Sequence, residues 1–137
     1  MTRVFLDANV LFTAAHNPAG KAALLIELGS QGRWTVLTSA YAVEEARHNL
    51  QLKYPDAAPG LNRLLPTLRI VAPGPGQECP VRLPAKDQPI FLATLAGEAT
   101  HLLTGDWKDF GAMMEKPDKT LGIIVQTVAA FLASHPA

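Results

Sequence analysis

Cysteine is almost absent from this chain, which has only Cys79 among its 137 residues. A single cysteine excludes an internal disulfide framework and any cysteine-rich zinc site, and it is in keeping with a reducing cytosol. The histidines show none of the close spacing of a metal-binding pair; they are His16, His48, His101 and His135. The sequence therefore offers no zinc site built on cysteine or histidine.

An excess of charge and a long hydrophobic run are also missing. Lysine and arginine together number 12, as do aspartate and glutamate, so no overall basic field would attract nucleic acid. This balance argues against a broad, nonspecific nucleic-acid coat protein, but it leaves room for phosphate contacts from a local patch and a metal ion. The longest apolar stretches, residues 22–28 and 121–132, contain polar breaks well before the ~20 residues that a bilayer requires. No charged-then-apolar leader precedes Val4, and we expect a soluble, cytoplasmic protein with no membrane partner.

What the chain does have is a regular alternation of short apolar runs and helical patterns. Apolar residues make up 48% of the chain, enough for one core, so we expect a single domain over residues 1–137. Strands are predicted near residues 3–6, 34–37, 68–71, 100–104 and 121–125. Helices are predicted near residues 11–15, 21–32, 39–53, 56–65, 87–97 and 126–134. This alternation predicts an α/β fold with a parallel sheet.

A segment rich in proline and glycine lies between Ala72 and Pro84. Its prolines cannot continue a helix or a central strand, so it is predicted to be a loop. Gly74-Pro75-Gly76 is not a phosphate-binding loop, because no Lys-Ser/Thr pair follows it, and nucleotide cofactors are disfavoured. The loop leads to Asp87, so it is either a plain surface connection or one wall of a substrate groove.

Two acidic residues come directly after predicted strands. Asp7 follows the apolar run Val4-Phe5-Leu6, and Asp106 follows residues 101–104 and Gly105. In open α/β sheets, ligands bind outside the carboxyl ends of the strands, near the point where the strand order reverses. We therefore expect both carboxylates at one edge of the sheet.

Two further acids are placed by predicted helices. Asp87 precedes Gln88-Pro89, and proline in the first turn marks the start of a helix. Glu45 lies in a helix for which Ser39 is the expected N-cap. Glu44 points about 100° away from Glu45, so only one of the two can face a site comfortably.

Each acid also has a simpler explanation. Asp7, Asp87 and Asp106 occupy positions that suit helix N-caps, and Glu45 would be solvated beside Glu44. Carboxylates gathered at one edge, however, would repel and would raise one another's pKa values, a conflict that a divalent cation removes. Oxygen ligands without histidine or cysteine suit Mg²⁺ or Mn²⁺, which also bind substrate phosphates. Together the four acids predict a metal-ion nuclease site.

Polar and basic neighbours of these acids are further candidates. Asn9 and Thr104 would orient a carboxylate or a bound water, or would form local turn bonds. Lys86 and Lys108 would contact phosphates, or would simply be solvated. Other basic residues near the Glu45 helix are candidates for a wider phosphate-binding patch, although scattered charges also serve solubility; they are Arg47, His48 and Lys53.

Along nearly its whole length the chain resembles the PIN-domain ribonucleases, many of which are VapC-like toxins of VapBC toxin-antitoxin pairs. The resemblance rests on the order and spacing of four segments. These are Val4-Phe5-Leu6-Asp7-Ala8-Asn9-Val10-Leu11, Thr38-Ser39 with Glu45 six residues after Ser39, Asp87 with Ile90 and Ala93, and Leu103-Thr104-Gly105-Asp106 with Asp109-Phe110. The resemblance implies a three-layer α/β/α sandwich with a central parallel sheet of about five strands. It also implies Mg²⁺- or Mn²⁺-dependent hydrolysis of RNA phosphodiester bonds and, frequently, a protein antitoxin encoded beside the toxin.

Site roles are carried over residue by residue. The resemblance assigns catalysis and metal binding to Asp7, Glu45, Asp87 and Asp106. Spacing from Ser39 favours Glu45 over Glu44, and Asp109 matches a position that is acidic in only some members. Homodimers are common in this family, so the apolar stripes within residues 22–29 and 61–68 either pack in the core or leave a groove for a second copy or an antitoxin segment.

Other classes of protein place acids on a similar sheet. A haloacid-dehalogenase-like phosphatase would need Asp at both ends of the triplet Asp7-Ala8-Asn9, and a receiver domain would need an Asp after the third strand and a Lys after the fifth; the chain has neither. A catalytically silent PIN-like domain that binds RNA or protein, a non-toxin RNA-processing nuclease, and a flap-nuclease-like enzyme share the acids and stay open as alternatives.

Overall fold

A five-stranded parallel sheet lies at the centre of the molecule. The structure, a computed structural model, describes residues 1–136. Its strands are β1 (Arg3–Leu6), β2 (Thr35–Ser39), β3 (Arg69–Val71), β4 (His101–Leu103) and β5 (Ile124–Gln126). They are arranged in the order β3-β2-β1-β4-β5, and every neighbouring pair is parallel. The predicted parallel α/β sheet is confirmed.

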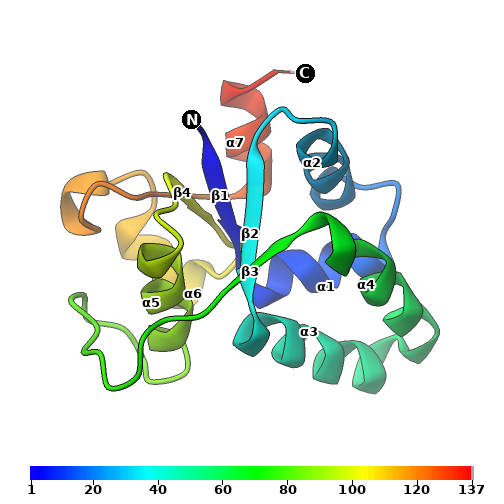
Figure 1. Cartoon of the computed structure of the whole chain (residues 1–137), viewed down its shortest axis with the longest axis horizontal. Helices are drawn as coiled ribbons and strands as arrows, with labels where there is room; N and C mark the ends of the chain where they lie inside the picture. Colours follow the sequence, from blue (N-terminus) through cyan, green and yellow to red (C-terminus); the bar gives the residue numbers. More distant parts are fainter. Residues whose placement is uncertain (137) are drawn as a thin grey trace.

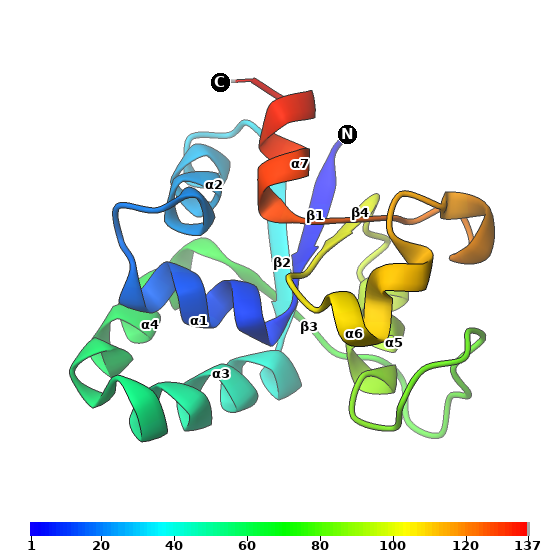
Figure 2. The ribbon, with the colours of Figure 1, turned by 180° about the vertical axis from the view of Figure 1, so that it is seen from behind.

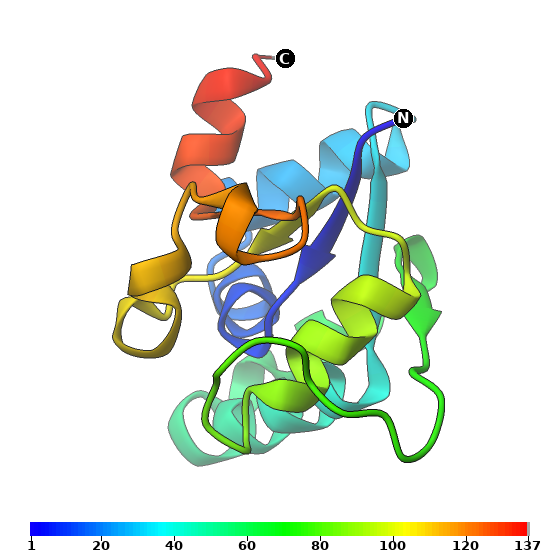
Figure 3. The same cartoon turned by 90° about the vertical axis from the view of Figure 1, so that its left-hand side faces the viewer.

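Seven α-helices within residues 1–136 flank the sheet (Figure 1). They are α1 (Ala8–His16), α2 (Lys21–Ser30), α3 (Ala40–Lys53), α4 (Ala58–Leu64), α5 (Gln88–Ala96), α6 (Trp107–Phe110) and α7 (Val128–Ser134). Short 3₁₀ turns occupy Pro55–Ala57, Leu65–Thr67, Gly111–Met113 and Pro117–Lys119. Helix α5 packs on β2 and β4, whereas α2 packs on β2 and α7. The views in Figures 1 and 3 place α5 on one side of the sheet and α2 with α7 on the other, which gives three layers of PIN-like α/β/α type. No helix in the described part is both long and apolar enough to cross a membrane.

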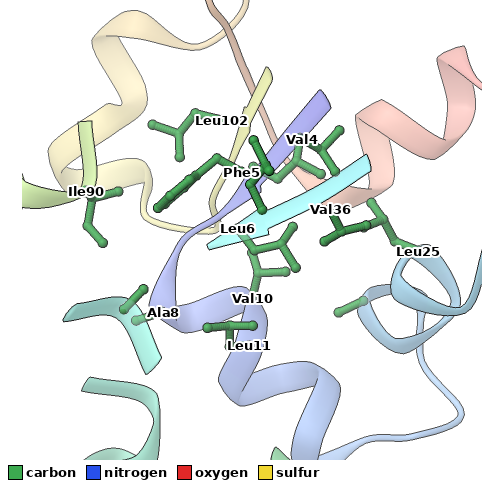
Figure 4. Packing of buried hydrophobic residues seen from close by; sticks show 14 of the residues in the cluster. Val4, Phe5, Leu6, Ala8, Val10, Leu11, Leu25, Val36, Ile90 and Leu102 are labelled. Carbon is green, nitrogen blue, oxygen red and sulfur yellow. The ribbon is translucent and has the colours of Figure 1, made fainter. Parts of the chain in front are cut away.

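The central strands are apolar on both faces because helices cover both. Val4, Phe5 and Leu6 of β1 are completely buried. Alternate side chains of a strand point to opposite faces, so Phe5 lies on the α5 side with Ile90, whereas Val36 of β2 faces Leu25 of α2 (Figure 4). Strand sequences that are apolar throughout, without alternating polar residues, therefore indicate a sheet that is buried between two helical layers.

Close packing of α2 on β2 depends on Gly29. A Cβ added at Gly29 would overlap Cγ2 of Val36, so a side chain there would push the helix away from the strand. Most of the stripe around this glycine belongs to the core, since Ala22, Leu25 and Ile26 are buried.

The strand order reverses between β1 and β4. From β1 the chain proceeds outward through β2 to β3, then crosses back to β4 and continues to β5. Leu6 pairs with Leu103 in register, and the Asp7 N–H donates to the Leu103 carbonyl at 3.1 Å. The residues that follow β1 and β4 therefore leave the sheet side by side, at the position where open α/β sheets bind ligands.

Some boundaries differ from the prediction. The last strand begins at Ile124 rather than at residue 121, because Leu121 and Gly122 have φ values of 55° and 89° and form a turn. The last helix begins at Val128, after Thr127 as N-cap, rather than at residue 126. Helix α6 was not predicted at all, since its four residues are too short to show a periodic pattern.

Candidate active site at the carboxyl edge of the sheet

A cleft of about 790 Å³ opens at the carboxyl edge of the sheet. Asp7, Glu45, Asp87 and Asp106 all line it, so the structure brings the four predicted acids to one place. Figure 2 shows α1 and α3 side by side, with α5 and α6 across from them. None of residues 72–84 lines the cleft, and the proline-rich segment is therefore a surface connection rather than a groove wall.

Asp7 is held in one orientation by its neighbours. Its side chain is only 3% exposed. Oδ1 accepts the Ala8 N–H at 2.7 Å, and Oδ2 accepts the Thr104 hydroxyl at 2.7 Å and the Asn9 amide at 3.1 Å. Burial raises the pKa of Asp7 despite these hydrogen bonds, and Asp106 raises it further by repulsion. The fold thus keeps a buried carboxylate where its charge is disfavoured, which is typical of functional positions.

Asn9 and Thr104 link the ends of β1 and β4. The Asn9 amide also lies 3.2 Å from the Thr104 hydroxyl, and Asn9 Oδ1 accepts the Gly105 N–H at 2.8 Å. Thr104 Oγ1 in turn accepts the Asp106 N–H at 3.0 Å. Both residues therefore orient Asp7 and the backbone that carries Asp106, and their bonds are not confined to local turns.

Asp87, Asp106 and Asp109 form the tightest acidic group. Each offers a carboxylate oxygen, and these oxygens lie within 4.8 Å of one another. Asp106 caps α6 by accepting the Asp109 N–H at 3.0 Å, whereas Asp87 precedes α5 without making a side-chain cap bond. Asp109, predicted only as an accessory acid, is thus more closely grouped with Asp87 and Asp106 than Asp7 and Glu45 are.

The pKa values of Asp87 and Asp109 in this group are shifted in opposite directions. Burial raises the pKa of Asp87 to about 7, and a hydrogen bond to Asp109 and repulsion from that carboxylate add to the effect. The pKa of Asp109 is lowered by the same hydrogen bond and by Lys86. Ionisation of both carboxyl groups together is therefore disfavoured, as expected for acids at short range.

Lys86 forms an ion pair with one member of the acidic group. Its Nζ lies 3.1 Å from Asp109 Oδ2, which raises the pKa of Lys86. The Tyr41 hydroxyl donates to the Lys86 carbonyl at 2.7 Å and so fastens this segment to α3. Lys86 was predicted as a phosphate contact, and it lines the cleft, but in this structure its partner is Asp109.

Glu45, and not Glu44, faces the cleft. Ser39 is the N-cap of α3, as predicted, and accepts the Ala42 N–H at 3.2 Å. Glu45 is half-buried, and its pKa is raised by burial and by repulsion from Asp7. Glu44 is exposed, and its Oε1 lies 3.8 Å from Arg47 Nε. Of the two neighbouring glutamates, Glu45 is therefore the one that faces the cleft.

Several predicted basic residues lie elsewhere. Lys108, on the short helix α6, is exposed and does not line the cleft. Arg47 donates to Asn62 at 2.8 Å, and His48 is exposed outside the cleft. Of the suggested patch near the Glu45 helix, only Lys53 lines the cleft.

Sequence reasoning missed several residues of the cleft, among them the polar side chains of Asn49 and Lys21. Asn49 could have been found, because Glu45, Asn49 and Lys53 are spaced four residues apart and share one helix face. Lys21 carried no such signal, since its position depends on how α2 follows the Asn17-Pro18 break.

The donor set fits a hard divalent cation. Asp87 Oδ2 is buried and accepts no bond from an N–H group or a hydroxyl group within residues 1–136, and a buried carboxylate oxygen without such a donor is costly unless a cation approaches it. Asp7 Oδ1 accepts a single bond, so one of its lone-pair sites remains. Oxygen donors of this kind suit Mg²⁺ or Mn²⁺.

Comparison with known proteins bears on the fold. No family model and no curated protein matches the sequence. Among solved structures, the chain is similar to one in the crystal structure of VapBC2 from Rickettsia felis bound to a DNA fragment from their promoter, with a TM-score of 0.65. The two chains share 15% sequence identity over 92% of this chain and 98% of that one. The likeness supports a PIN-like architecture and, at this identity, the architecture alone.

Proposed function

We propose that this chain is a Mg²⁺- or Mn²⁺-dependent endoribonuclease that acts in the cytoplasm as the toxin of a VapBC-type toxin-antitoxin pair. One observation carries the proposal: four acids from distant parts of the sequence line one cleft where the strand order reverses. The sequence resemblance to PIN-domain ribonucleases supports the substrate class, and the likeness in fold to a chain of a VapBC2 structure is in keeping with a toxin-antitoxin pair.

Metal binding is assigned to the acids of the cleft. Asp87, Asp106 and Asp7, with Glu45 and Asp109 beside them, would hold the ion. A bound Mg²⁺ or Mn²⁺ supplies Lewis acidity, which activates water and offsets negative charge on a phosphate. Without the ion, burial and the neighbouring carboxylates raise the pKa of Asp87 to about 7.

Water is the expected attacking group, because no side chain of the cleft is prepared as a nucleophile. The hydroxyls of Thr13, Thr104 and Thr127 are engaged with the Asn9 carbonyl, Asp7 Oδ2 and the Ala130 N–H, respectively. No serine and no cysteine lines the cleft, and neither does any of the four histidines, all of which lie in the described part of the chain. Hydrolysis therefore requires no covalent enzyme intermediate.

Cleavage of a mixed single-stranded RNA pool tests the proposal. Wild-type protein and Asp7→Asn are incubated with Mn²⁺, with Mg²⁺, or with chelator. Cleavage that needs metal and is lost in the variant is expected. Metal binding without cleavage of any RNA would instead favour the catalytically silent RNA- or protein-binding domain.

Metal binding itself is measured by thermal unfolding. An ion that binds only the folded state at 100 times its Kd adds about 2.7 kcal/mol of stability, and Asp87→Asn should remove most of that added stability. If Mn²⁺ raises the Tm of neither protein, the metal assignment is wrong.

The antitoxin is proposed to bind outside the acidic cleft. A second hollow of about 520 Å³ between α1, α2 and α4 is lined by mostly apolar residues, among them Ala14, Pro18, Leu24 and Leu64. Leu24 is 47% exposed there, which suits an apolar segment of a partner. Co-expression with the protein encoded by the neighbouring gene should give a complex that Leu24→Asp weakens, and a homodimer would instead be seen by gel filtration of the chain alone.

A further inference from the structure

The cleft extends beyond the acids to an end with the opposite charge. Lys21, Asn49 and Lys53 line this part, together with Phe12 and Thr13. We call Lys21, Asn49 and Lys53 the lysine end. Carboxylates at one end and ammonium groups at the other divide a single cleft into two electrostatic halves.

Both lysines of the lysine end are free of carboxylate partners. Within residues 1–136 the ion pairs are Glu44 with Arg47 and Lys86 with Asp109. Asn49 likewise makes no side-chain hydrogen bond to another described residue, although it is half-buried. The lysine end therefore presents unused donors to whatever occupies the cleft.

Phe12 supports one of these lysines. The Lys53 Nζ lies 5.8 Å from the centroid of the Phe12 ring, within the range of a cation–π contact. The ring itself packs against His16 and Tyr54, with centroid distances of 5.1 and 5.8 Å. This aromatic group keeps the ammonium over the cleft without neutralising it.

We propose that the lysine end is a backbone subsite for single-stranded RNA, in which Lys21 and Lys53 bind phosphates beyond the bond that is cut and Asn49 binds a sugar or base between them. This proposal rests on the proposed nuclease function. Free lysines that track phosphates along a groove are the usual means of binding single strands. With equal numbers of acidic and basic residues in the chain, such a local pair is what attracts the substrate.

Helix α3 sets the distance between the subsite and the acids. Glu45 and Lys53 are eight residues apart, which is about 12 Å along a helix. One strand of nucleic acid advances about 3.4 Å per stacked nucleotide, so Lys53 lies roughly three nucleotides from the acids. A dinucleotide would reach the acids without reaching Lys53, whereas an octanucleotide would reach both.

RNA binding by a double variant tests the subsite. The Asp7→Asn protein, in which cleavage is expected to be slowed, is the parent, and Lys21→Gln/Lys53→Gln is built into it; both are measured with Mn²⁺ present. Fluorescence anisotropy with a labelled octanucleotide is measured between 50 and 200 mM salt. We expect affinity to fall on the order of tenfold, and the slope of log K against log salt to decrease by about 1.4, or about 0.7 for each phosphate that a lysine no longer neutralises.

Two controls isolate the effect. Lys119→Gln removes one exposed lysine outside the cleft and should leave both quantities unchanged, and thermal unfolding checks that each variant folds. Binding of a dinucleotide should be equally weak in the parent and the double variant. Equal octanucleotide affinity and slope in the double variant and Lys119→Gln would overturn the subsite, as would an equal loss with the dinucleotide.

Failure of the subsite and failure of the nuclease are distinguishable. Wild-type cleavage of RNA together with unchanged binding by the double variant would retain the nuclease and reject the subsite. Absence of wild-type cleavage together with weakened, less salt-dependent binding by the double variant would reject the nuclease and retain the subsite as an RNA-binding element.

Discussion

Replacement of Asp7 by asparagine separates the catalytic role of this residue from its structural one. The two side chains have nearly the same volume, and the asparagine carbonyl can still accept the Ala8 N–H that Asp7 Oδ1 accepts at 2.7 Å. The new amide would replace Oδ2, so the bonds that Oδ2 accepts from the Thr104 hydroxyl at 2.7 Å and the Asn9 amide at 3.1 Å would be lost. The substitution therefore removes a charge and a metal ligand while preserving most of the packing.

The effect on stability follows from the raised pKa of Asp7. Loss of the charge-assisted bond from Thr104 costs about 1.5–3 kcal/mol, but the desolvation of a buried carboxylate and its repulsion by Asp106 are relieved. Because the folded state raises the pKa, it binds the proton more tightly than the unfolded chain, and stability due to this group falls as pH rises above 3.8. At pH 7 we expect Asp7→Asn to differ from wild type by no more than about 1 kcal/mol, with stabilisation as the favoured sign.

The effect on activity is far larger. Loss of a group that orients or binds a catalytic ion lowers the rate by at least about 100-fold. Urea unfolding at pH 5 and pH 7 gives the stability, and cleavage of labelled RNA at several Mn²⁺ concentrations gives the rate. Full activity at saturating Mn²⁺ would refute the role of Asp7 as a ligand, and a loss of stability above about 3 kcal/mol would show that the substitution acts through the fold.

Three further predictions test other parts of the structure. Glu45→Gln should reduce RNA cleavage at least about tenfold, whereas Glu44→Gln should not, because an exposed ion pair contributes less than about 1 kcal/mol; equal rates in the two variants would reject the choice of Glu45. Burial lowers the pKa of His101 to about 4, so the unfolded chain takes up the proton first as pH falls below about 6.5, and the fold should lose about 2 kcal/mol at pH 5 relative to pH 8. His101→Gln should lack this loss in urea unfolding, and the same loss in both proteins would assign it to other groups. Gly29→Ala should lower the free energy of unfolding by about 1–3 kcal/mol, because its Cβ would overlap Val36; a change below about 0.5 kcal/mol would show that α2 moves freely.

The sheet was predictable because its central strands have clear local patterns. Val4-Phe5-Leu6 has no polar alternation, and burial between α2 and α5 accounts for this directly. Once the sheet is parallel, residues after β1 and β4 must emerge at the same edge, so Asp7 and Asp106 could be brought together without any knowledge of side-chain packing.

Register and short elements were not predictable in the same way. Asp109 joins Asp87 and Asp106 because the four-residue helix α6 turns it inward, and four residues give no periodic signal. The start of β5 was placed too early because Leu121 is apolar, although its positive φ puts it in a turn. Lys21 lines the cleft because α2 packs against α1. This is a tertiary contact, which local sequence patterns do not predict.

Helix capping and metal binding turn out to be compatible roles for the same carboxylate. Asp7 and Asp106 both cap helices in the structure, and both still line the cleft. A cap bond uses one lone-pair site of a carboxylate that has about four, so a residue that caps with one oxygen can bind a cation through its remaining sites. Asp87, by contrast, makes no cap bond and has a buried oxygen without a partner. Acids at helix starts do not by themselves indicate a metal site. A metal site is indicated by carboxylate lone pairs that remain free after the N-cap hydrogen bonds have formed.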